Sequence, residues 1–545
     1  MMERDAEAGE ELQGLTSRQT RWLLLGILVI GLAWRFFGAA DRSLWYDEAK
    51  AYFLSRFTFS ELITRLHYDI QPPLYYLVLH GWEQAFGTTA LVLRLPSVLF
   101  GTLAILGVYL CTVELLREPA KDDAVRAPAS PQARETGLWA AALVSMSVFQ
   151  IRAAWDISMY AVGAALAAFS SWVLIRALHA RLGRYGLWLL YVVLAILFSY
   201  THDFGMLTVA AQWIFVVGYV AMQAGSGKEG TFLRRFVGHP QFELIARAAP
   251  VLVLCWLPWQ GAFADQWRQL QEVSWMPSPS WIMAGGYTYH ALVEPEGYPP
   301  PEAIPVVLGC AAFCLAVLLA LLWRAGVAER FVLLACLVPL ALSLAGATLC
   351  GLHIFYSRHF LFAHLFFLVG VALLLGRIRS AHARMITGGL VLAVMFAIDV
   401  RYALVEDLRS PSYSGLVAYI DSERRTGEPV VVCDQLAYLP LLYHAYGAPD
   451  WYMWGQSPNA SDDTWMAMGA ENVLRGQDLQ DMRGTRVWVV NTRPLDSSRS
   501  LDGSTSEVEV PNWWRVRGKK EFSDRYGIKR NLEVVEYEVP AEVGD

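Results

Sequence analysis

Four side chains in one short stretch of the chain, residues 47–69, have the types and spacing needed for chemistry. Asp47 and Glu48 are adjacent carboxylates that follow the first long apolar run. His67 and Asp69 come next, beside the rigid Pro-Pro pair at 72–73. A carboxylate can take a proton from a hydroxyl, and carboxylate and imidazole groups bind divalent cations. The segment therefore predicts a general base and one or two metal ligands.

Two of these residues have simpler interpretations that the sequence leaves open. Asp47 also suits the N-cap of the helix that follows it. A complete capping box would then place Glu or Gln at position 50, where Lys50 stands. His67 on its own is as consistent with an interfacial histidine as with a metal ligand.

The composition indicates that a membrane must surround the elements that position these residues. The chain has 545 residues, of which 55% are hydrophobic and 17% charged, against about 25% charged in soluble domains. This excludes a soluble enzyme, a disordered chain and a disulfide-rich secreted module. Eleven apolar runs predict membrane-spanning helices, or up to thirteen if some runs are split. They lie near 22–40, 90–116, 137–154, 159–178, 186–200, 205–224, 247–263, 302–323, 331–350, 359–376 and 385–403.

Charge and length divide the chain into parts. The tail at 1–21 is polar and precedes a full span, so it is not a cleavable signal. Residues 22–403 form the membrane domain, with a first outer loop at 41–73. Leu74–Phe86 is too short to span and predicts an interfacial or re-entrant helix. Residues 404–545 hold 15 Lys and Arg against 23 Asp and Glu, which suggests a separate acidic domain in water.

Basic residues predict the orientation of the bundle. Lys and Arg gather in alternate connections, beginning with the N-terminal tail, so these connections should be cytoplasmic. An odd number of spans then places the acidic domain outside the cell. The ionisable residues other than Lys and Arg gather at the outer end, which places any chemistry at the outer water–lipid boundary.

The acidic domain has an α/β pattern. Val-rich segments separated by helical segments predict a small parallel or mixed sheet. The expected helices are 413–424 and 436–446, and the expected strands are 429–433, 486–491 and 532–539. No glycine-rich phosphate loop follows the first strand, so neither a nucleotide site nor a nucleic-acid partner is expected.

An ordered set of motifs over residues 43–110 resembles a known family. These motifs are Trp-x-Asp-Glu at 45–48, Asp-x-x-Pro-Pro-Leu-Tyr-Tyr at 69–76, Phe-Gly at 86–87 and Leu-Arg-Leu-Pro-Ser at 93–97. Weaker similarities follow at 200–205 and 357–361. The chain resembles the bacterial membrane glycosyltransferases of the GT-C superfamily, in the protein-mannosyltransferase-like and aminoarabinose-transferase-like group (glycosyltransferase family 39-like).

The resemblance implies a mainly α membrane bundle with an outer α/β domain, in the bacterial cytoplasmic membrane. It also implies transfer of a sugar, with inversion, from a polyprenyl-phosphate carrier to a lipid, glycan or protein acceptor on the outer face. It assigns Asp47 as general base and Arg358 as phosphate anchor. The other implied site residues are Glu48, His67 and Asp69, which position the base or the acceptor or form a divalent-metal site, and His202, His359 and Tyr75, which bind substrate.

The chain departs from the family pattern at three positions. Gln71 stands where many relatives carry His, Ser158 stands where Arg is common, and His359 replaces a usual Tyr. Arg152 is the one nearby residue that could replace the missing basic contact. Arg94 is expected to anchor the end of a span rather than to contact substrate.

Two other functions are considered. A transporter or flippase of lipid-linked sugars predicts ionisable groups along a central path and repeat symmetry, and the sequence has neither. A membrane-anchored assembly scaffold would leave the residues at 47–48 and 67–73 without a purpose.

Overall fold

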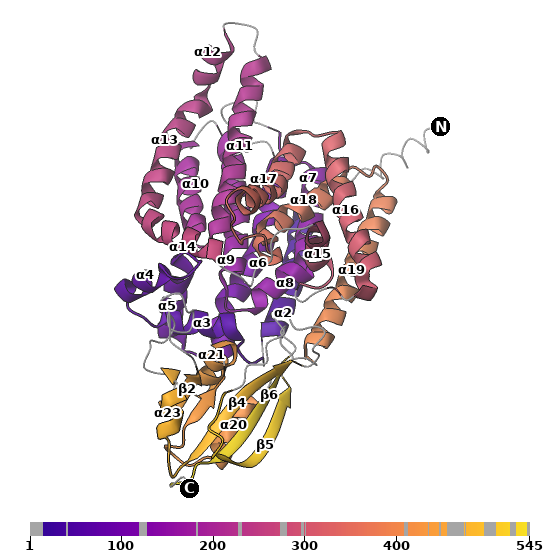
Figure 1. Cartoon of the computed structure of the whole chain (residues 1–545). Helices are drawn as coiled ribbons and strands as arrows, with labels where there is room; N and C mark the ends of the chain where they lie inside the picture. The colour runs from indigo at the N-terminus through magenta and orange to yellow at the C-terminus, as the bar shows by residue number, and fades with distance from the viewer. Residues whose placement is uncertain are drawn as a thin grey trace.

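The computed structural model describes residues 15–39, 42–118, 128–180, 184–226, 231–272, 281–295, 299, 301–407, 413–433, 435–445, 448–454, 473–474, 476–494, 508–523 and 530–541. A bundle of long helices forms most of the molecule, and a small sheet lies against one end of it (Figure 1). Three short helices of the first loop lie at that end, whereas α12 (Phe232–Val237) lies at the opposite end.

The predicted membrane-spanning helices are present. In the described part of the chain, nine helical segments are long and apolar enough to cross a membrane. They are α2 (Ser17–Ala39), α6 (Ala90–Leu115), α9 (Met159–His179), α11 (Asp203–Ser226), α13 to α14 (Pro240–Trp256 and Gln260–Glu272, joined by η1 at Leu257–Trp259), α16 (Ile304–Trp323, preceded by η2 at Pro301–Ala303), α17 (Val327–Leu349), η3 with α18 (Ser357–Phe360 and Leu361–Gly376) and α19 (Ala381–Asp407).

The other two predicted spans differ in form. The run at 137–154 is two helices, α7 (Pro131–Ser145) and α8 (Val148–Trp155), bent by 56°. The bend follows from Ser147, whose hydroxyl accepts the amide hydrogen of Gln150 and so starts a new helix. The run at 186–200 is the shorter helix α10 (Arg184–Ser199). One further described helix, α15 (Trp281–Leu292), precedes η2.

Burial separates the central helices from the peripheral ones. Within the most apolar stretch of each helix, 83% of residues are buried in α9 and 89% in α18, against 17% in α16 and 11% in α19. α6 and α9 pack closely because Gly107 has no side chain where a Cβ atom would lie 2.8 Å from that of Ala168. The exposed apolar faces of α2, α16 and α19 suit contact with lipid.

The segment that follows α2 folds into α3 (Tyr46–Ser55), α4 (Phe59–Leu66) and α5 (Leu74–Phe86). Thr58 and Glu61 form a capping box at the start of α4, and this helix ends directly before His67. The bounds of α5 agree with the predicted ones. The loop is thus built from ordered helices that can hold side chains in fixed positions.

The C-terminal part contains a mixed sheet, as predicted, with six strands where three were expected. Its strand order is β3-β2-β1-β4-β6-β5; β1 to β4 pair in parallel, and β6 pairs antiparallel with β4 and β5. The strands are β1 (Val430–Val432), β2 (Trp451–Trp454), β3 (Val473–Leu474), β4 (Arg486–Pro494), β5 (Arg515–Ser523) and β6 (Arg530–Glu538). Three helices accompany them, α20 (Tyr413–Glu423), α21 (Gln435–His444) and α23 (Gly476–Asp481).

Helix α21 joins the sheet to the short helices that follow α2. It lies between the sheet and α3 (Figure 1), and its buried residues belong to one apolar cluster with those of α3 and α5. The Tyr443 ring meets the Tyr52 ring edge-on at 5.2 Å, and the Tyr443 hydroxyl donates to the carbonyl of Thr88 at 2.8 Å. The C-terminal part therefore helps to hold α3 in place.

Candidate active site

The start of α3 settles the role of its two carboxylates in capping. The N-cap residue is Trp45, and Asp47 and Glu48 lie in the first turn, where negative charge favours a helix. The Trp45 amide hydrogen bonds to the Glu48 carboxylate at 3.3 Å. The alternative in which Asp47 is the N-cap is therefore wrong.

Asp47 instead forms an ion pair with a residue from far along the chain. Arg358 Nη1 donates to Asp47 Oδ2 at 2.7 Å, and the Arg358 guanidinium also lies 5.2 Å from the centre of the Tyr356 ring. The side chains of Asp47 and Arg358 are 39% and 31% exposed. The structure thus brings together the predicted base and the predicted phosphate anchor, and both are open to a ligand.

Glu48 is buried and serves a different purpose. Its carboxylate receives two hydrogen bonds of 2.7 Å from Arg94, and both side chains have no exposed surface. It also accepts the amide hydrogen of Ile157 at 3.0 Å. Arg94 completes its own bonding with the carbonyls of Ala39, Arg42 and Ser43. Arg94 therefore ties α6 to the start of α3, in keeping with the predicted anchoring role.

Asp69 and His67 point to separate partners. Asp69 is 2% exposed and accepts hydrogen bonds from Lys50 at 3.0 Å and Tyr76 at 2.9 Å. His67 Nδ1 lies 2.9 Å from the Asp265 carboxylate on α14. Asp69 therefore fixes the loop to α3, and His67 fixes it to α14.

The predicted metal ligands Glu48, His67 and Asp69 are not gathered at one point. The described residues contain no group of three or more His, Cys, Asp and Glu side chains arranged to hold a metal ion. Both oxygens of Glu48 are already bonded to Arg94, so this carboxylate does not fit the ligand role. A requirement for a divalent ion stays a prediction.

Two histidines lie next to Arg358. The rings of His202 and His359 are 5.9 Å apart, and His202 also meets Tyr160 at 5.0 Å. His202 Nδ1 accepts the amide hydrogen of Phe204 at 3.1 Å. Burial first, and then the nearby His359 and Arg358, lower the pKa of His202 well below its usual value.

The environment of His202 fixes its tautomer. A neutral imidazole that accepts through Nδ1 carries its hydrogen on Nε2. That Nε2 atom is buried and has no hydrogen-bond partner among the described residues. It is therefore a donor available to a ligand in a protein interior where most buried donors are satisfied.

Tyr75 and Arg152 are both buried. Tyr75 is 1% exposed and lies beside Ser97, beneath α3, so the structure does not bring it to the open part of the site. Arg152 is 3% exposed and forms an ion pair with Asp156, the residue directly after its own helix. That it replaces the family's basic contact stays a prediction. Gln71 is 9% exposed, with its side-chain oxygen buried.

Three residues near the site were missed by the sequence reasoning. Lys50 pairs with Asp69, Tyr160 packs on His202, and Tyr356 supports Arg358. The signal for Lys50 was its spacing of three from Asp47, which places both on neighbouring parts of one helix face. Tyr356 has no motif that would distinguish it from the many aromatic residues at membrane boundaries.

Comparison with solved structures identifies the fold. No protein-family profile and no curated protein sequence matches the chain. Among solved structures it is similar to ArnT from Cupriavidus metallidurans bound to undecaprenyl phosphate, with a TM-score of 0.52 and 14% identity over 96% of this chain and 100% of that one. The same protein in the apo state gives a TM-score of 0.54 and 14% identity over 95% and 98%.

A weaker likeness is to an oligosaccharyltransferase from Archaeoglobus fulgidus. It has a TM-score of 0.47 and 12% identity over 79% of this chain and 63% of the other. The chain has the fold of the GT-C membrane glycosyltransferases. Within that fold it is similar to ArnT over nearly the whole length of both chains, so the predicted resemblance is confirmed.

Proposed function

We propose that the protein is an integral membrane glycosyltransferase that moves a sugar from a polyprenyl-phosphate carrier to an acceptor. The observation that carries this proposal is the partly exposed pair of Asp47 and Arg358 at one end of an ArnT-like bundle. The pair offers a base for a hydroxyl and a cation for a phosphate at one point. The ArnT structure bound to undecaprenyl phosphate supports a carrier of this chemical class.

Asp47 is the general base in this proposal. The acceptor hydroxyl oxygen attacks the anomeric carbon of the sugar, and its proton passes to the Asp47 carboxylate. The bond from that carbon to the phosphate oxygen breaks, and the carrier leaves as polyprenyl phosphate. A single displacement inverts the anomeric centre. No second acid is needed because phosphate is a good leaving group, unlike the sugar oxygen cleaved by glycosidases.

Arg358 links donor binding to the availability of the base. Its guanidinium donates a hydrogen bond to Asp47. Phosphate oxygens bind a guanidinium through charge-assisted hydrogen bonds of the same kind and can take the place of the carboxylate. Donor binding would then release Asp47 toward the acceptor while Arg358 neutralises the leaving phosphate.

The two histidines complete the phosphate site. His202 offers its buried Nε2 hydrogen, and its low pKa keeps it neutral, so it can donate without adding charge. His359 lies beside it, with Nδ1 held by the carbonyl of Ile354 at 2.8 Å. Asp69 acts as a positioning residue through Lys50 on α3.

We infer the sidedness from charge. The connections at the end opposite the sheet are rich in arginine, which supports a cytoplasmic N-terminus and a site on the outer face of the bacterial cytoplasmic membrane. The C-terminal sheet then lies outside the cell beside the site. There it can contact a lipid, glycan or protein acceptor.

Transfer from a labelled polyprenyl-phosphate sugar to added acceptors, by purified full-length protein, tests the proposal. Asp47→Asn should reduce transfer by at least about 100-fold, since a positioned base typically contributes 10²–10⁴. Glu243→Gln, at an exposed ion pair on α13, is the matched control and should retain activity. Retained transfer by Asp47→Asn would remove Asp47 as the base. Failure of the unaltered protein with every carrier sugar would instead favour a transporter or a scaffold.

A further inference from the structure

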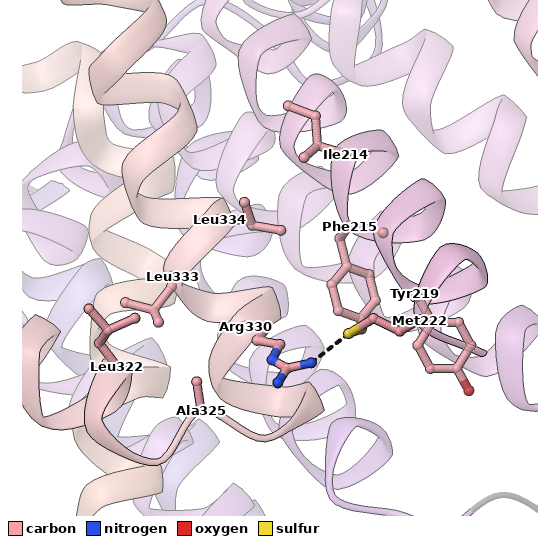
Figure 2. Close-up of a pocket in the computed structure, with 10 residues that line it drawn as sticks. Ile214, Phe215, Tyr219, Met222, Leu322, Ala325, Arg330, Leu333 and Leu334 are labelled. Carbon is pink, nitrogen blue, oxygen red and sulfur yellow. Dashed lines mark hydrogen bonds between the residues drawn. The ribbon is translucent and has the colours of Figure 1, made fainter. Parts of the chain in front are cut away.

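A second site candidate lies at the other end of the bundle. Asp203 begins α11 beside His202, and residues 214–222 lie about three to five turns further along the same helix. There a cavity of about 580 Å³ opens between α11 and the junction of α16 with α17 (Figure 2). Its lining residues are Ile214, Phe215, Gly218, Tyr219, Met222, Leu322, Ala325, Arg330, Leu333 and Leu334.

The walls of this cavity are apolar and its volume is substantial. It falls within the range of about 300–1,000 Å³ found for small-molecule sites. Ile214, Gly218 and Met222 are spaced by four residues, so they form one stripe along α11. Ile214, Met222 and Leu322 are 48%, 41% and 63% exposed. The cavity therefore opens on the periphery of the bundle and not into its interior.

Arg330 is the charged residue of the cavity. Its guanidinium reaches from α17 across the opening toward the sulfur of Met222 on α11 (Figure 2). Among the residues whose structure is described, no carboxylate pairs with it. The cavity thus has an apolar interior and a cation at its rim.

Gly218 keeps the cavity open. A Cβ atom at this position would meet no other atom within 4 Å. The space beside α11 is therefore empty of side chains and not filled by a neighbouring helix. A larger side chain at 218 can enter the cavity without displacing anything.

The surroundings of the cavity are basic. Other arginines at this end of the helices are Arg18, Arg134, Arg234, Arg235, Arg324, Arg377 and Arg384. Two of them, Arg377 and Arg384, are paired with Glu329 and Glu135. Basic residues at one membrane face attract anionic headgroups, and basic pockets between membrane helices bind them. We propose that this cavity binds an anionic diacyl phospholipid, with an acyl chain along α11 and its phosphate on Arg330.

The occupant is a phospholipid of this leaflet and not the sugar carrier. The carrier's phosphate belongs at the Asp47 and Arg358 end in the proposed function, on the far side of the bundle. The two sites are therefore separate, and lipid binding here does not require that the chain be a transferase.

Native mass spectrometry of the delipidated full-length protein, titrated with dioleoyl phosphatidylglycerol or dioleoyl phosphatidylcholine, tests this site. The protein should bind phosphatidylglycerol at least about fivefold more tightly, since one basic residue near the surface contributes that much. Arg330→Gln should abolish this preference. Arg18→Gln removes one charge at the same end, away from the cavity, and should preserve it.

A second pair of variants tests the apolar part. Gly218→Phe should lower the affinity for both lipids by filling the cavity. Gly309→Phe, at an equally open glycine on α16, should leave both affinities unchanged. The proposal is overturned if Arg330→Gln keeps the preference or if Gly218→Phe binds as the unaltered protein does. It is also overturned if polyprenyl phosphate displaces phosphatidylglycerol from this site.

Discussion

Arg358 donates a hydrogen bond of 2.7 Å to Asp47, a residue 311 positions earlier in the chain. The bond joins the start of the α18 segment to the first turn of α3, and both side chains remain partly exposed. The neighbouring pair of Glu48 and Arg94 is joined by two hydrogen bonds of 2.7 Å and has no exposed surface. Exposure therefore separates a pair that a ligand can open from a pair that holds the fold together.

Replacement of Arg358 should weaken donor binding and leave stability nearly unchanged. Hydrogen bonds to charged groups contribute about 1.5–3 kcal/mol, so Arg358→Gln should raise the carrier KM by about 10- to 100-fold. The melting temperature should change little because the pair is partly exposed. Arg401→Gln, at an exposed arginine that pairs with Glu294, is the control and should leave KM unaltered. Equal effects of both variants on KM would argue against a phosphate contact by Arg358.

Replacement of Arg94, in contrast, should strongly lower the stability of the protein. Arg94→Gln leaves Glu48 buried without its cation, a change that costs about 3–5 kcal/mol. Thermal unfolding in detergent should show a large loss, partly restored in the double variant with Glu48→Gln. Arg268→Gln, at an exposed pair with Asp265, should cost no more than about 1 kcal/mol. A similar small loss for Arg94→Gln would remove its anchoring role.

Much of the fold was predictable because membrane spans are set by length and hydropathy alone. All eleven predicted runs correspond to apolar helical segments. The break between α7 and α8 was missed, since hydropathy does not register a serine that caps a new helix. In the sheet, β2, β3 and β5 were missed. β2 lacks the valines that marked β1, β3 has two residues, and β5 is mostly polar and lies at an edge.

The site was predictable at the level of which end of the bundle it occupies. Asp47 and Arg358 were both predicted at this end, and the structure brings them into contact. The separate roles of Asp47 and Glu48 were not predictable from their motif. Adjacent residues on a helix point about 100° apart, so one faces the site and the other faces α6. Only the packing of α3 decides which residue does which.

His202 should contribute a hydrogen bond to the donor without titrating near neutral pH. His202→Asn keeps an acceptor for the Phe204 amide hydrogen but removes the Nε2 donor, so carrier affinity should fall about tenfold. Because its pKa lies well below the usual value, His202 stays neutral from pH 6 to 8. The activity profiles of both proteins over this range should therefore have the same shape. A transition near pH 6.5 that the variant lacks would contradict this.

Contact between α21 and α3 should affect transfer through the placement of Asp47. Tyr443→Phe keeps the ring contact with Tyr52, whereas Tyr443→Ala loses it, and such aromatic pairs contribute about 0.5–1.5 kcal/mol. Tyr443→Ala should slow transfer by about two- to tenfold at unchanged carrier KM, and Tyr443→Phe by less. Tyr419→Ala is the control, since Tyr419 packs against Trp488 within the sheet part. If it slows transfer equally, the effect belongs to the sheet's stability and not to α3.

Acid should lower the stability of the folded protein through His444, the last residue of α21. Burial, with a smaller contribution from Arg94, lowers the pKa of His444 to about 4, against about 6.5 in an unfolded chain. Below pH 6.5 the unfolded chain gains a proton that folded His444 does not, so stability falls with pH until about pH 4. The loss totals no more than about 3 kcal/mol. Melting temperatures of the full-length protein, measured between pH 7 and 4, should fall less steeply for His444→Gln than for the unaltered protein. His382→Gln, at an exposed position of α19, is the control and should follow the unaltered protein. Parallel curves for His444→Gln and the unaltered protein would show that this histidine does not couple protonation to folding.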